Sequence, residues 1–431
     1  MRGALAAATL AVAAVALPGA QANHGVETFD AAWTIVRDSH FDPGMNGVDW
    51  NAVKTELRPK AVAAKNDDEL RRVIREMLGR LGQSHFALIP AGADSSTGGK
   101  SDLTADPGFE SRLIARSLVV TRLTPGGAAA GAGVKPGWVV DAIDGKSVSS
   151  AFAGLSDAMP RRLFDVEIWR RVESQLRGPG GTEVKVTFRD GADKPVTATL
   201  TRQREQGQPA KVGTLPTMYV RLESESRRTP AGKSAGVIRF NVWMAAVDAL
   251  FQKAVDGHRS ADGIVIDLRG NPGGLAAMLM GISGHFLTER KPLGVMKTRD
   301  AELKFTSNPR LVSAAGERVE PFAGPVAILV DALTGSASEC FAGGMQSLGR
   351  ARVFGQTSMG QALPAVFDKL PNGDVLIHAY GDFVTATGTR LEGRGVVPDE
   401  EVPLDRAQLL AGRDAPLERA LQWIDAARSD H

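Results

Sequence analysis

The sequence predicts an α/β fold in which helices cover a largely buried sheet. Three short apolar runs, AGVIRFNVW, GIVIDLRG and PVAILVDA, read as strands, because each is rich in Val, Ile and Leu. A helix-like segment, MAAVDALFQKAVDGH, lies between the first two, and another, SECFAGGMQSLG, follows the third. Since strands that alternate with helices form layered α/β sheets, we expect residues 213–405 to make such a core.

The first residues have the layout of a secretory signal peptide. A basic Arg2 precedes an apolar run at 4–17, a proline ends that run, and AQA at 20–22 matches an A-x-A cleavage site. We therefore predict that residues 1–22 are removed, with cleavage near Ala22, and that the mature chain is periplasmic or secreted. An uncleaved membrane anchor is the alternative, although the run is shorter than the roughly 18 residues of a membrane span.

Bulk composition excludes several kinds of partner. The net charge is +2 and the basic residues are scattered, so the chain lacks the electrostatic footprint of a nucleic-acid-binding protein. Cys340 is the single cysteine, and no pair of histidines has the spacing of a metal-binding helix. We predict no metal, no other cofactor, no nucleic acid and no stable membrane insertion after signal cleavage.

The N-terminal region, residues 23–90, is predicted to be helical. VETFDAAWTIVRDSHF and DELRRVIREMLGRLG place apolar residues at helical spacing, and DPGMNGVDW between them is rich in turn formers. A polar stretch at 90–109 is typical of a linker. At the other end of the chain we expect a C-terminal helix within 406–431.

Residues 107–204 resemble a PDZ domain of the bacterial protease type. SLVVTRL leads into a glycine- and alanine-rich turn, then GVKPGWVVDAIDGKSV and later GPGGTEVKVTFRDG. Trp138 replaces the usual aspartate, and the stretch 151–173 is longer than a minimal PDZ domain needs, which favours an extended helix. The resemblance implies a unit that adds a peptide strand to a sheet edge and holds the terminal carboxylate. A plain β-rich spacer is the alternative.

Three segments of the predicted core contain residues that are typical of catalytic sites. DLRGNPGG at 267–274 follows a strand, so its backbone amides can approach a ligand closely. Ser336, in LTGSASEC, lies between a strand and a helix, a corner typical of nucleophiles, although Thr334 departs from the G-x-S-x-G elbow. RLEGRGVVPDEEVP at 390–403 supplies a carboxylate beside further glycines.

GVIRFN, GIVIDLRGNPGG, GSASECFAGGMQSLGRARVFG and LEGRGVVPDEEV, in this order after the PDZ-like segment, resemble the carboxyl-terminal processing (tail-specific) serine peptidases. The resemblance covers residues 26–405 and implies a catalytic core of the Clp protease/crotonase-like ββα architecture. It also implies that Ser336 is the nucleophile and that the amides of Gly274 and Ala337 form the oxyanion hole. The implied substrate is a polypeptide whose C-terminus binds the PDZ-like domain.

The sequence departs from the best-known tail-specific proteases at the general base. Gln361 stands where they carry a lysine, and a neutral amide cannot accept the serine proton. Lys369, eight residues after Gln361, is the nearest downstream lysine that could take the role of the base. The tricorn-core-like branch of the family instead uses a histidine that follows a serine ahead of the PDZ region, together with a glutamate.

The sequence SHF occurs twice, around His40 and around His85. We choose His85 as the base, because LGRLGQSHF matches the L-G-x-x-H position of the family. By the same resemblance, Ser84 and Glu392 orient the His85 ring. A neutral imidazole is suited to take the serine proton and return it to the leaving amine. The sequence places three other histidines at the surface or in turns: His258, His285 and His378.

These observations predict a secreted serine endopeptidase that forms an acyl-enzyme on Ser336 with His85 as general base. A catalytically silent peptide-binding scaffold is the alternative, and the missing lysine favours it. A crotonase-type acyl-CoA enzyme shares only the architecture and does not fit the signal peptide or the serine motif.

Overall fold

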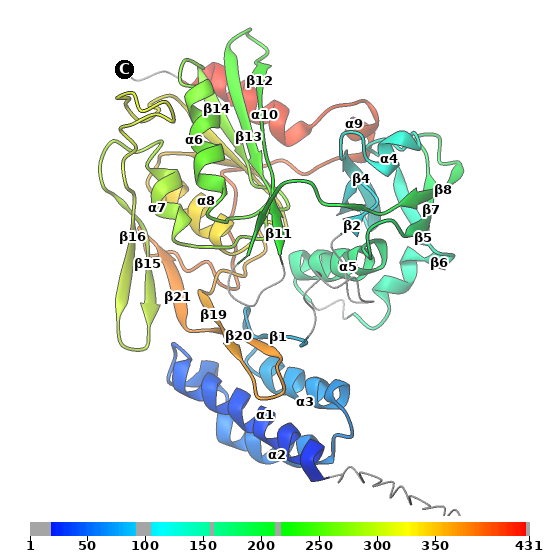
Figure 1. Cartoon of the computed structure of the whole chain (residues 1–431). Helices are drawn as coiled ribbons and strands as arrows, with labels where there is room; N and C mark the ends of the chain where they lie inside the picture. Colours follow the sequence, from blue (N-terminus) through cyan, green and yellow to red (C-terminus); the bar gives the residue numbers. More distant parts are fainter. Residues whose placement is uncertain (1–18, 92–104, 156–158, 212–216, 428–431) are drawn as a thin grey trace, which may run out of the picture.

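The computed structural model describes residues 19–91, 105–155, 159–211 and 217–427. Figure 1 shows a helical unit at one end, a β-rich unit to one side, and an α/β core that contacts both. Most of the predicted signal peptide and most of the predicted linker lie outside the described residues. Within the described part, no helix is both long and apolar enough to span a membrane.

The helical unit consists of three helices, α1 (Gly19–Ser39), α2 (Trp50–Ala63) and α3 (Asp67–Gly79). The side chains of Asp49 and Asn66 cap α2 and α3 by accepting hydrogen bonds from backbone amides of the first turn. The predicted apolar faces meet in one buried cluster that includes Phe29, Trp33 and Ile74. This packing confirms the helical assignment of the region.

A shared sheet joins the helical unit to the core. Strand β1 (Ala87–Ile89) pairs antiparallel with β20 (Val375–Ala379), which also pairs with β19 (Ala365–Lys369). Figure 1 shows β1 and β20 between the three helices and the core. An ion pair adds to this junction, because Arg71 of α3 donates two hydrogen bonds to the buried carboxylate of Asp374, at 2.8 and 2.9 Å.

The β-rich unit is an antiparallel sheet with the strand order β3-β4-β5-β7-β8. Its strands are β3 (Phe109–Ile114), β4 (Ser117–Leu123), β5 (Val139–Ile143), β7 (Glu183–Arg189) and β8 (Pro195–Thr201). Helix α5 (Arg161–Leu176) is the extended helix expected from the sequence, and it packs against the edge strand β3. Short strands β2 (Ala105–Asp106) and β9 (Gln203–Arg204) pair at the entrance and exit of the unit.

The core sheet has six strands in the order β12-β13-β14-β17-β18-β22. The strands are β12 (Leu222–Arg228), β13 (Ser234–Phe240), β14 (Gly263–Asp267), β17 (Val326–Val330), β18 (Arg352–Gly355) and β22 (Glu400–Glu401). From β13 to β22 all neighbours are parallel, and every residue of β14 and β17 is buried. The predicted α/β class is therefore confirmed, with β13, β14 and β17 as the three predicted strands.

Helices cover both faces of this sheet. Helices α6 (Val247–Gly257), α7 (Met278–Ser283) and α8 (Ala337–Ser347) pack on one face, and α10 (Ala415–Ala426) packs on the other. Two helices, α9 (Arg406–Leu410) and α10, occupy the region for which we predicted one C-terminal helix. They are separated by Gly412, whose φ of 72° is the left-handed conformation that ends helices.

Two smaller groups of strands complete the core. Strands β15 (Pro292–Thr298), β16 (Glu302–Thr306) and β21 (Gly381–Thr385) form an antiparallel sheet, and β10 (Gln208–Ala210) pairs with β11 (Met218–Val220).

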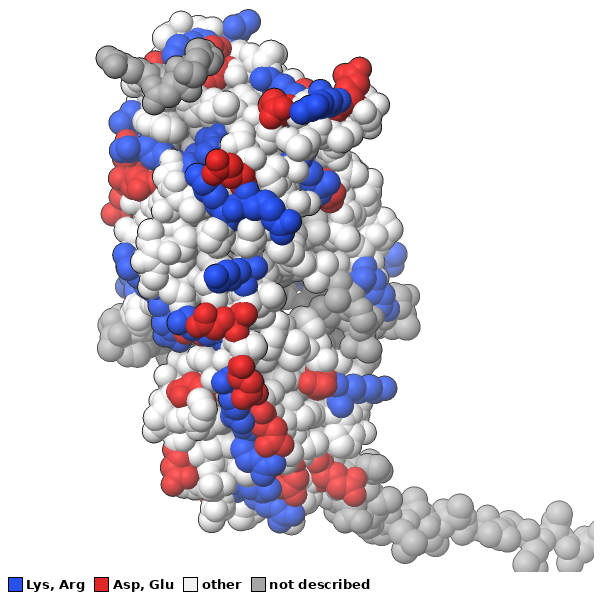
Figure 2. Space-filling model, turned by 90° about the vertical axis from the view of Figure 1, so that its left-hand side faces the viewer, with Lys and Arg blue, Asp and Glu red and all other residues white. Residues whose placement is uncertain are grey.

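Acidic and basic side chains are interspersed over the face shown in Figure 2. That pattern agrees with the near-neutral net charge of the chain.

Three histidines were predicted at the surface or in turns; His258 and His285 do lie in turns and His378 lies in β20, but none of the three is at the surface. His258, His285 and His378 are at most 8% exposed. Contacts from segments distant in sequence bury them: His258 hydrogen-bonds to Ser224 of β12, and His378 lies between the side chains of Ser39 and Asp368. Local turn signals carry no information about such packing.

Candidate active site

Ser336 occupies a strained corner between β17 and α8. Its φ and ψ are 51° and −120°, values that a non-glycine residue adopts only when its surroundings hold it there. The Ser336 amide donates to the carbonyl of Gln361 at 2.9 Å and to Oε2 of Glu339 at 3.0 Å. The residues on both sides are buried while Ser336 is partly exposed, so the corner presents this serine to the surface of the core.

The glycine loop after β14 lies directly against this corner. A Cβ atom on Gly273 would stand 2.6 Å from Cβ of Ser336, and one on Gly274 would stand 2.4 Å from the carbonyl oxygen of Trp243. Backbone bonds to Trp243 hold the loop on both sides of Gly274. Among the described residues, neither the amide of Gly274 nor that of Ala337 has a hydrogen-bond acceptor. Both amides are therefore available to a ligand.

Glu392, Ser84 and His85 form a hydrogen-bonded series. Ser84 donates its amide and its hydroxyl to the two oxygens of Glu392, at 2.9 and 2.8 Å, and its Oγ lies 2.8 Å from Nδ1 of His85. Because the hydroxyl proton goes to Glu392, Ser84 must accept from Nδ1–H of the histidine. This tautomer leaves Nε2 of His85 unprotonated and able to act as a base.

The Glu392–Ser84–His85 series and the backbone of Ser336 are hydrogen-bonded to two neighbouring residues, Ala362 and Gln361. Oε2 of Glu392 accepts the amide of Ala362 at 2.9 Å, and the preceding residue, Gln361, accepts the amide of Ser336. No hydrogen bond joins His85 to Ser336 directly in the described chain, but the backbone of Ser336 binds residue 361, and His85 is connected through Ser84 and Glu392 to residue 362. Proton-transfer contacts of this kind often tighten only when substrate is bound.

Burial controls the protonation of the His85 ring. The ring is partly buried, and the loss of hydration around its charged form lowers the pKa of His85 from 6.5 to about 4. The ring is therefore neutral at physiological pH, which is the state that a general base needs before it accepts a proton.

The other candidate bases have different surroundings. His40 is fully buried, with Nδ1 2.9 Å from the carbonyl oxygen of Asp42 and Nε2 2.9 Å from the side-chain oxygen of Gln83. Both of its ring nitrogens are thus occupied by structural contacts. Lys369 is exposed on β19 and makes no ion pair with any described residue. Neither residue is bonded to the segments that hold Ser336.

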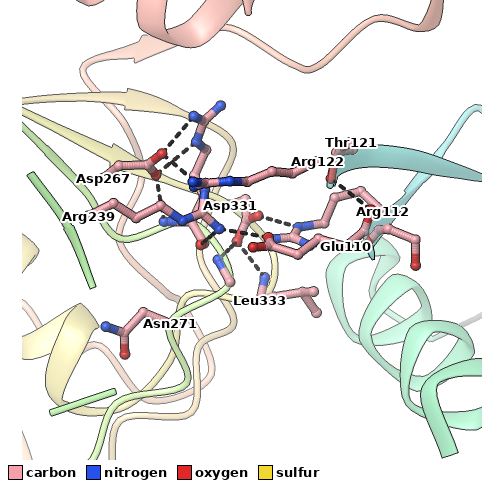
Figure 3. A network of polar contacts seen from close by, with 12 residues as sticks. Glu110, Arg112, Thr121, Arg122, Arg239, Asp267, Asn271, Asp331 and Leu333 are labelled. Atoms are coloured by element: carbon pink, nitrogen blue, oxygen red, sulfur yellow. Dashed lines mark hydrogen bonds and ion pairs between the residues drawn. The ribbon is translucent and has the colours of Figure 1, made fainter. Parts of the chain in front are cut away.

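Sequence reasoning missed the charged network that supports the glycine loop. Asp331, just after β17, accepts the amides of Gly270 and Leu333 on one oxygen, and Nε of Arg112 donates to its other oxygen at 2.6 Å (Figure 3). Arg112 comes from β3 of the β-rich unit. A carboxylate immediately after a buried strand was the available signal, but its partner could not be inferred from local sequence.

A second arginine of the β-rich unit touches the opposite side of the site. Arg162, in the first turn of α5, donates to the carbonyl of Met359 at 3.2 Å and to that of Gly393. These carbonyls flank the segments that carry Gln361 and Glu392. The β-rich unit therefore contacts both the loop side and the base side of the candidate site.

A cavity of about 540 Å³ lies between the β-rich unit and the core. Its lining includes side chains from β3, α5, β11 and β13, and it reaches Gly270, Pro272 and Leu333 beside the glycine loop. Apolar and charged side chains share the wall, among them Trp169, Tyr219, Phe240, Glu173 and Arg239. No group of three or more potential metal ligands occurs in the described chain.

The chain is similar to known peptidases. Residues 234–402 match peptidase family S41, and residues 26–79 match the tricorn protease C1 domain. The putative tricorn protease homolog 2 of Streptomyces coelicolor is 27% identical in an alignment of 414 positions that covers 92% of this chain and 32% of that protein. The carboxyl-terminal-processing protease of Synechocystis is 26% identical over 91% of this chain and 85% of its own length.

Solved structures share the fold. The photosystem II D1 C-terminal processing protease superposes with a TM-score of 0.57 at 23% identity, over 91% of this chain and 98% of that one. The tricorn protease superposes with a TM-score of 0.51 at 16% identity, over 94% of this chain and 37% of its own. Residues 234–402 therefore form a domain of peptidase family S41 that includes the Ser336 corner, and the chain as a whole is similar to the carboxyl-terminal-processing serine proteases.

Proposed function

We propose that this chain cleaves polypeptides through an acyl-enzyme on Ser336, with His85 as the general base. The observation that carries the proposal is the Glu392–Ser84–His85 series, attached through residues 361–362 to the amide of Ser336. Gln361 cannot replace a catalytic lysine, whereas the unprotonated Nε2 of His85 can accept a proton.

The proposed reaction has two halves. Oγ of Ser336 attacks the substrate carbonyl as Nε2 of His85 takes its proton, and Glu392 acts through Ser84 to stabilise the imidazolium that forms. The imidazolium then protonates the leaving amine. Water, activated by the same imidazole, releases the acyl group.

The amides of Gly274 and Ala337 are the proposed donors to the oxyanion of both tetrahedral intermediates. Their lack of acceptors among the described residues supports this role. One such donor contributes about 2.7–4 kcal/mol to the stability of the transition state in comparable acyl-transfer sites.

We also propose that the β-rich unit is a PDZ-like module that binds the substrate's C-terminal segment. Strand β3 pairs with β4 on one side only, and α5 lies beside its other side, an arrangement that can accept an added peptide strand. The cavity between this unit and the core extends from β3 and α5 to Pro272, next to the glycine loop. The predicted signal peptide supports action in the periplasm or outside the cell.

The experiment is a peptidase assay on an unfolded protein substrate with wild type, Ser336→Ala, His85→Ala and Lys369→Ala. We expect background activity for the first two variants and full activity for Lys369→Ala, which removes the lysine considered as an alternative base. Loss of activity in Lys369→Ala with activity retained in His85→Ala would overturn the assignment of the base. A folded wild type with no activity would instead favour the peptide-binding scaffold.

A further inference from the structure

Glu339 is a buried carboxylate that the proposed reaction does not use. It lies in the first turn of α8, three residues after Ser336, and is 0% exposed. Its Oε2 accepts the amides of Ser336 and Gln361, each at 3.0 Å. Its Oε1 accepts the amide of Gly360 at 2.7 Å and the hydroxyl of Ser358 at 2.5 Å. One side chain thus binds both the backbone of Ser336 and the segment 358–361, whose next residue, Ala362, binds Glu392.

No cation forms an ion pair with Glu339 in the described chain. Its four hydrogen-bond donors are neutral backbone or hydroxyl groups. The titratable or charged groups nearby are Cys340 on the same helix, Asp382 of β21 beyond it, Glu392, which binds the next amide along the 358–362 segment, and Arg162 of α5, which donates to the carbonyl of Met359 beside Gly360. A function for such a buried, unpaired carboxylate has to come from the bonds it accepts.

We propose that Glu339 is a positioning residue whose ionised form holds the Ser336 corner in its reactive conformation, so that neutralising it disables the nucleophile while His85 is still a competent base. This inference rests on the proposed role of Ser336. It assigns to the same site a second ionisation that is separate from that of the base.

Protonation of Glu339 disturbs the corner because three of its four partners can only donate. A neutral carboxyl group presents an O–H, which the amides of Ser336, Gly360 and Gln361 cannot accept. Only the hydroxyl of Ser358 could accept it, and that hydroxyl already accepts the amide of Val396 at 2.7 Å. The hydroxyl proton of Ser358 would then lose its partner in a buried position, which is unfavourable.

The two ionisations are separated widely enough to be distinguished. Burial raises the pKa of Glu339 from 4.5 to about 7, whereas burial lowers that of His85 to about 4. The acid limb of kcat/KM reports groups of the free enzyme. If His85 alone controlled it, activity would persist well below pH 6, but if ionised Glu339 is required, activity falls by half near pH 7.

Stability has the opposite dependence on pH at this residue, which separates positioning from unfolding. A carboxyl group whose pKa is higher in the folded than in the unfolded chain contributes stability below the unfolded value of 4.5 that is lost as pH rises through about 7. Protonation of Glu339 between pH 7 and pH 5.5 therefore does not destabilise the fold. Activity should decline over this range without a matching fall in Tm from this group.

The test measures kcat/KM and Tm from pH 5 to pH 9 for wild type, Ser358→Ala, Glu339→Gln and the control Ser347→Ala. We expect a wild-type acid limb near pH 7. The hydrogen bond from Ser358 lowers the pKa of Glu339, so Ser358→Ala should raise this pKa and shift the acid limb to higher pH. Glu339→Gln should lose about 100-fold in kcat with little change in KM, as expected for a misplaced nucleophile, and should lack the limb near pH 7. Ser347, whose hydroxyl binds Gly344 at the far end of α8, should leave the limb unchanged.

An acid limb near pH 4–5 in wild type, or one that Ser358→Ala does not move although the variant is folded, would overturn the role of Glu339 and leave the proposed function intact. A wild type that is inactive and whose Ser336 does not react with a fluorophosphonate at any pH would overturn the proposed function and this inference together.

Discussion

Ser336 is held by contacts made within the α/β core, whereas His85 is held by contacts that cross from the helical unit to the core. Both residues have left-handed backbone conformations, with φ of 51° and 60°, so both need external support. For Ser336 that support comes from the neighbouring loops of adjacent parallel strands. For His85 it comes from Glu392, more than 300 residues away, and from the pairing of β1 with β20. The nucleophile is thus part of the core fold, and the base depends on docking.

The largest expected effect comes from adding a side chain at Gly273, in the core beside Ser336. A Cβ atom there would lie 2.6 Å from Cβ of Ser336 and 2.8 Å from the amide of Ala337. Gly273→Ala should lower kcat by at least about 10³-fold, because it displaces the nucleophile and an oxyanion donor together. Gly316→Ala is the matched control, since its φ is also positive but its Cβ would meet open space. Equal activity of the two variants would contradict this prediction.

An intermediate effect is expected from replacing the carboxylate of Glu392, which orients His85 through Ser84. Glu392→Gln keeps the shape but replaces an acceptor oxygen by an NH₂ group that faces the N–H and O–H donors of Ser84 and Ala362. We expect kcat/KM to fall by about 100-fold with Tm close to wild type. The control Glu302→Gln removes an exposed carboxylate on β16 and should be neutral. Wild-type activity in Glu392→Gln would show that His85 needs no orienting group.

The smallest of the three effects is expected from loosening the docking of the helical unit. Removing Arg71 leaves the carboxylate of Asp374, which is fully buried, without its cation, a change that typically costs about 3–5 kcal/mol. Arg71→Ala should therefore lower Tm and reduce kcat/KM by roughly tenfold, about 1.4 kcal/mol, through a less well placed His85. Arg72→Ala is the control, because its side chain is 73% exposed. Indistinguishable variants would mean that the junction does not depend on this pair.

The same contrast explains how much the sequence could predict. The strand and helix patterns around Ser336 and the glycines near Gly274 are local, so the core strands and the nucleophile corner could be located from short motifs. His85 could be chosen over His40 only through a resemblance, because periodicity does not show which SHF reaches the core. The partners that are distant in sequence could not be predicted: Arg112 and Arg162 come from another unit, and the bonds from residues 358, 360 and 361 to Glu339 join two separate segments.

The most direct test of the central claim is the rate at which a fluorophosphonate reacts with Ser336, located by mass spectrometry, in wild type, His85→Ala and Lys369→Ala at pH 8. If the neutral imidazole of His85 activates the serine, wild type and Lys369→Ala should be labelled at Ser336 at equal rates, and His85→Ala should react at least about 10²-fold more slowly, the lower end of what a general base contributes. Equal labelling of wild type and folded His85→Ala, or slow labelling of Lys369→Ala, would contradict the account.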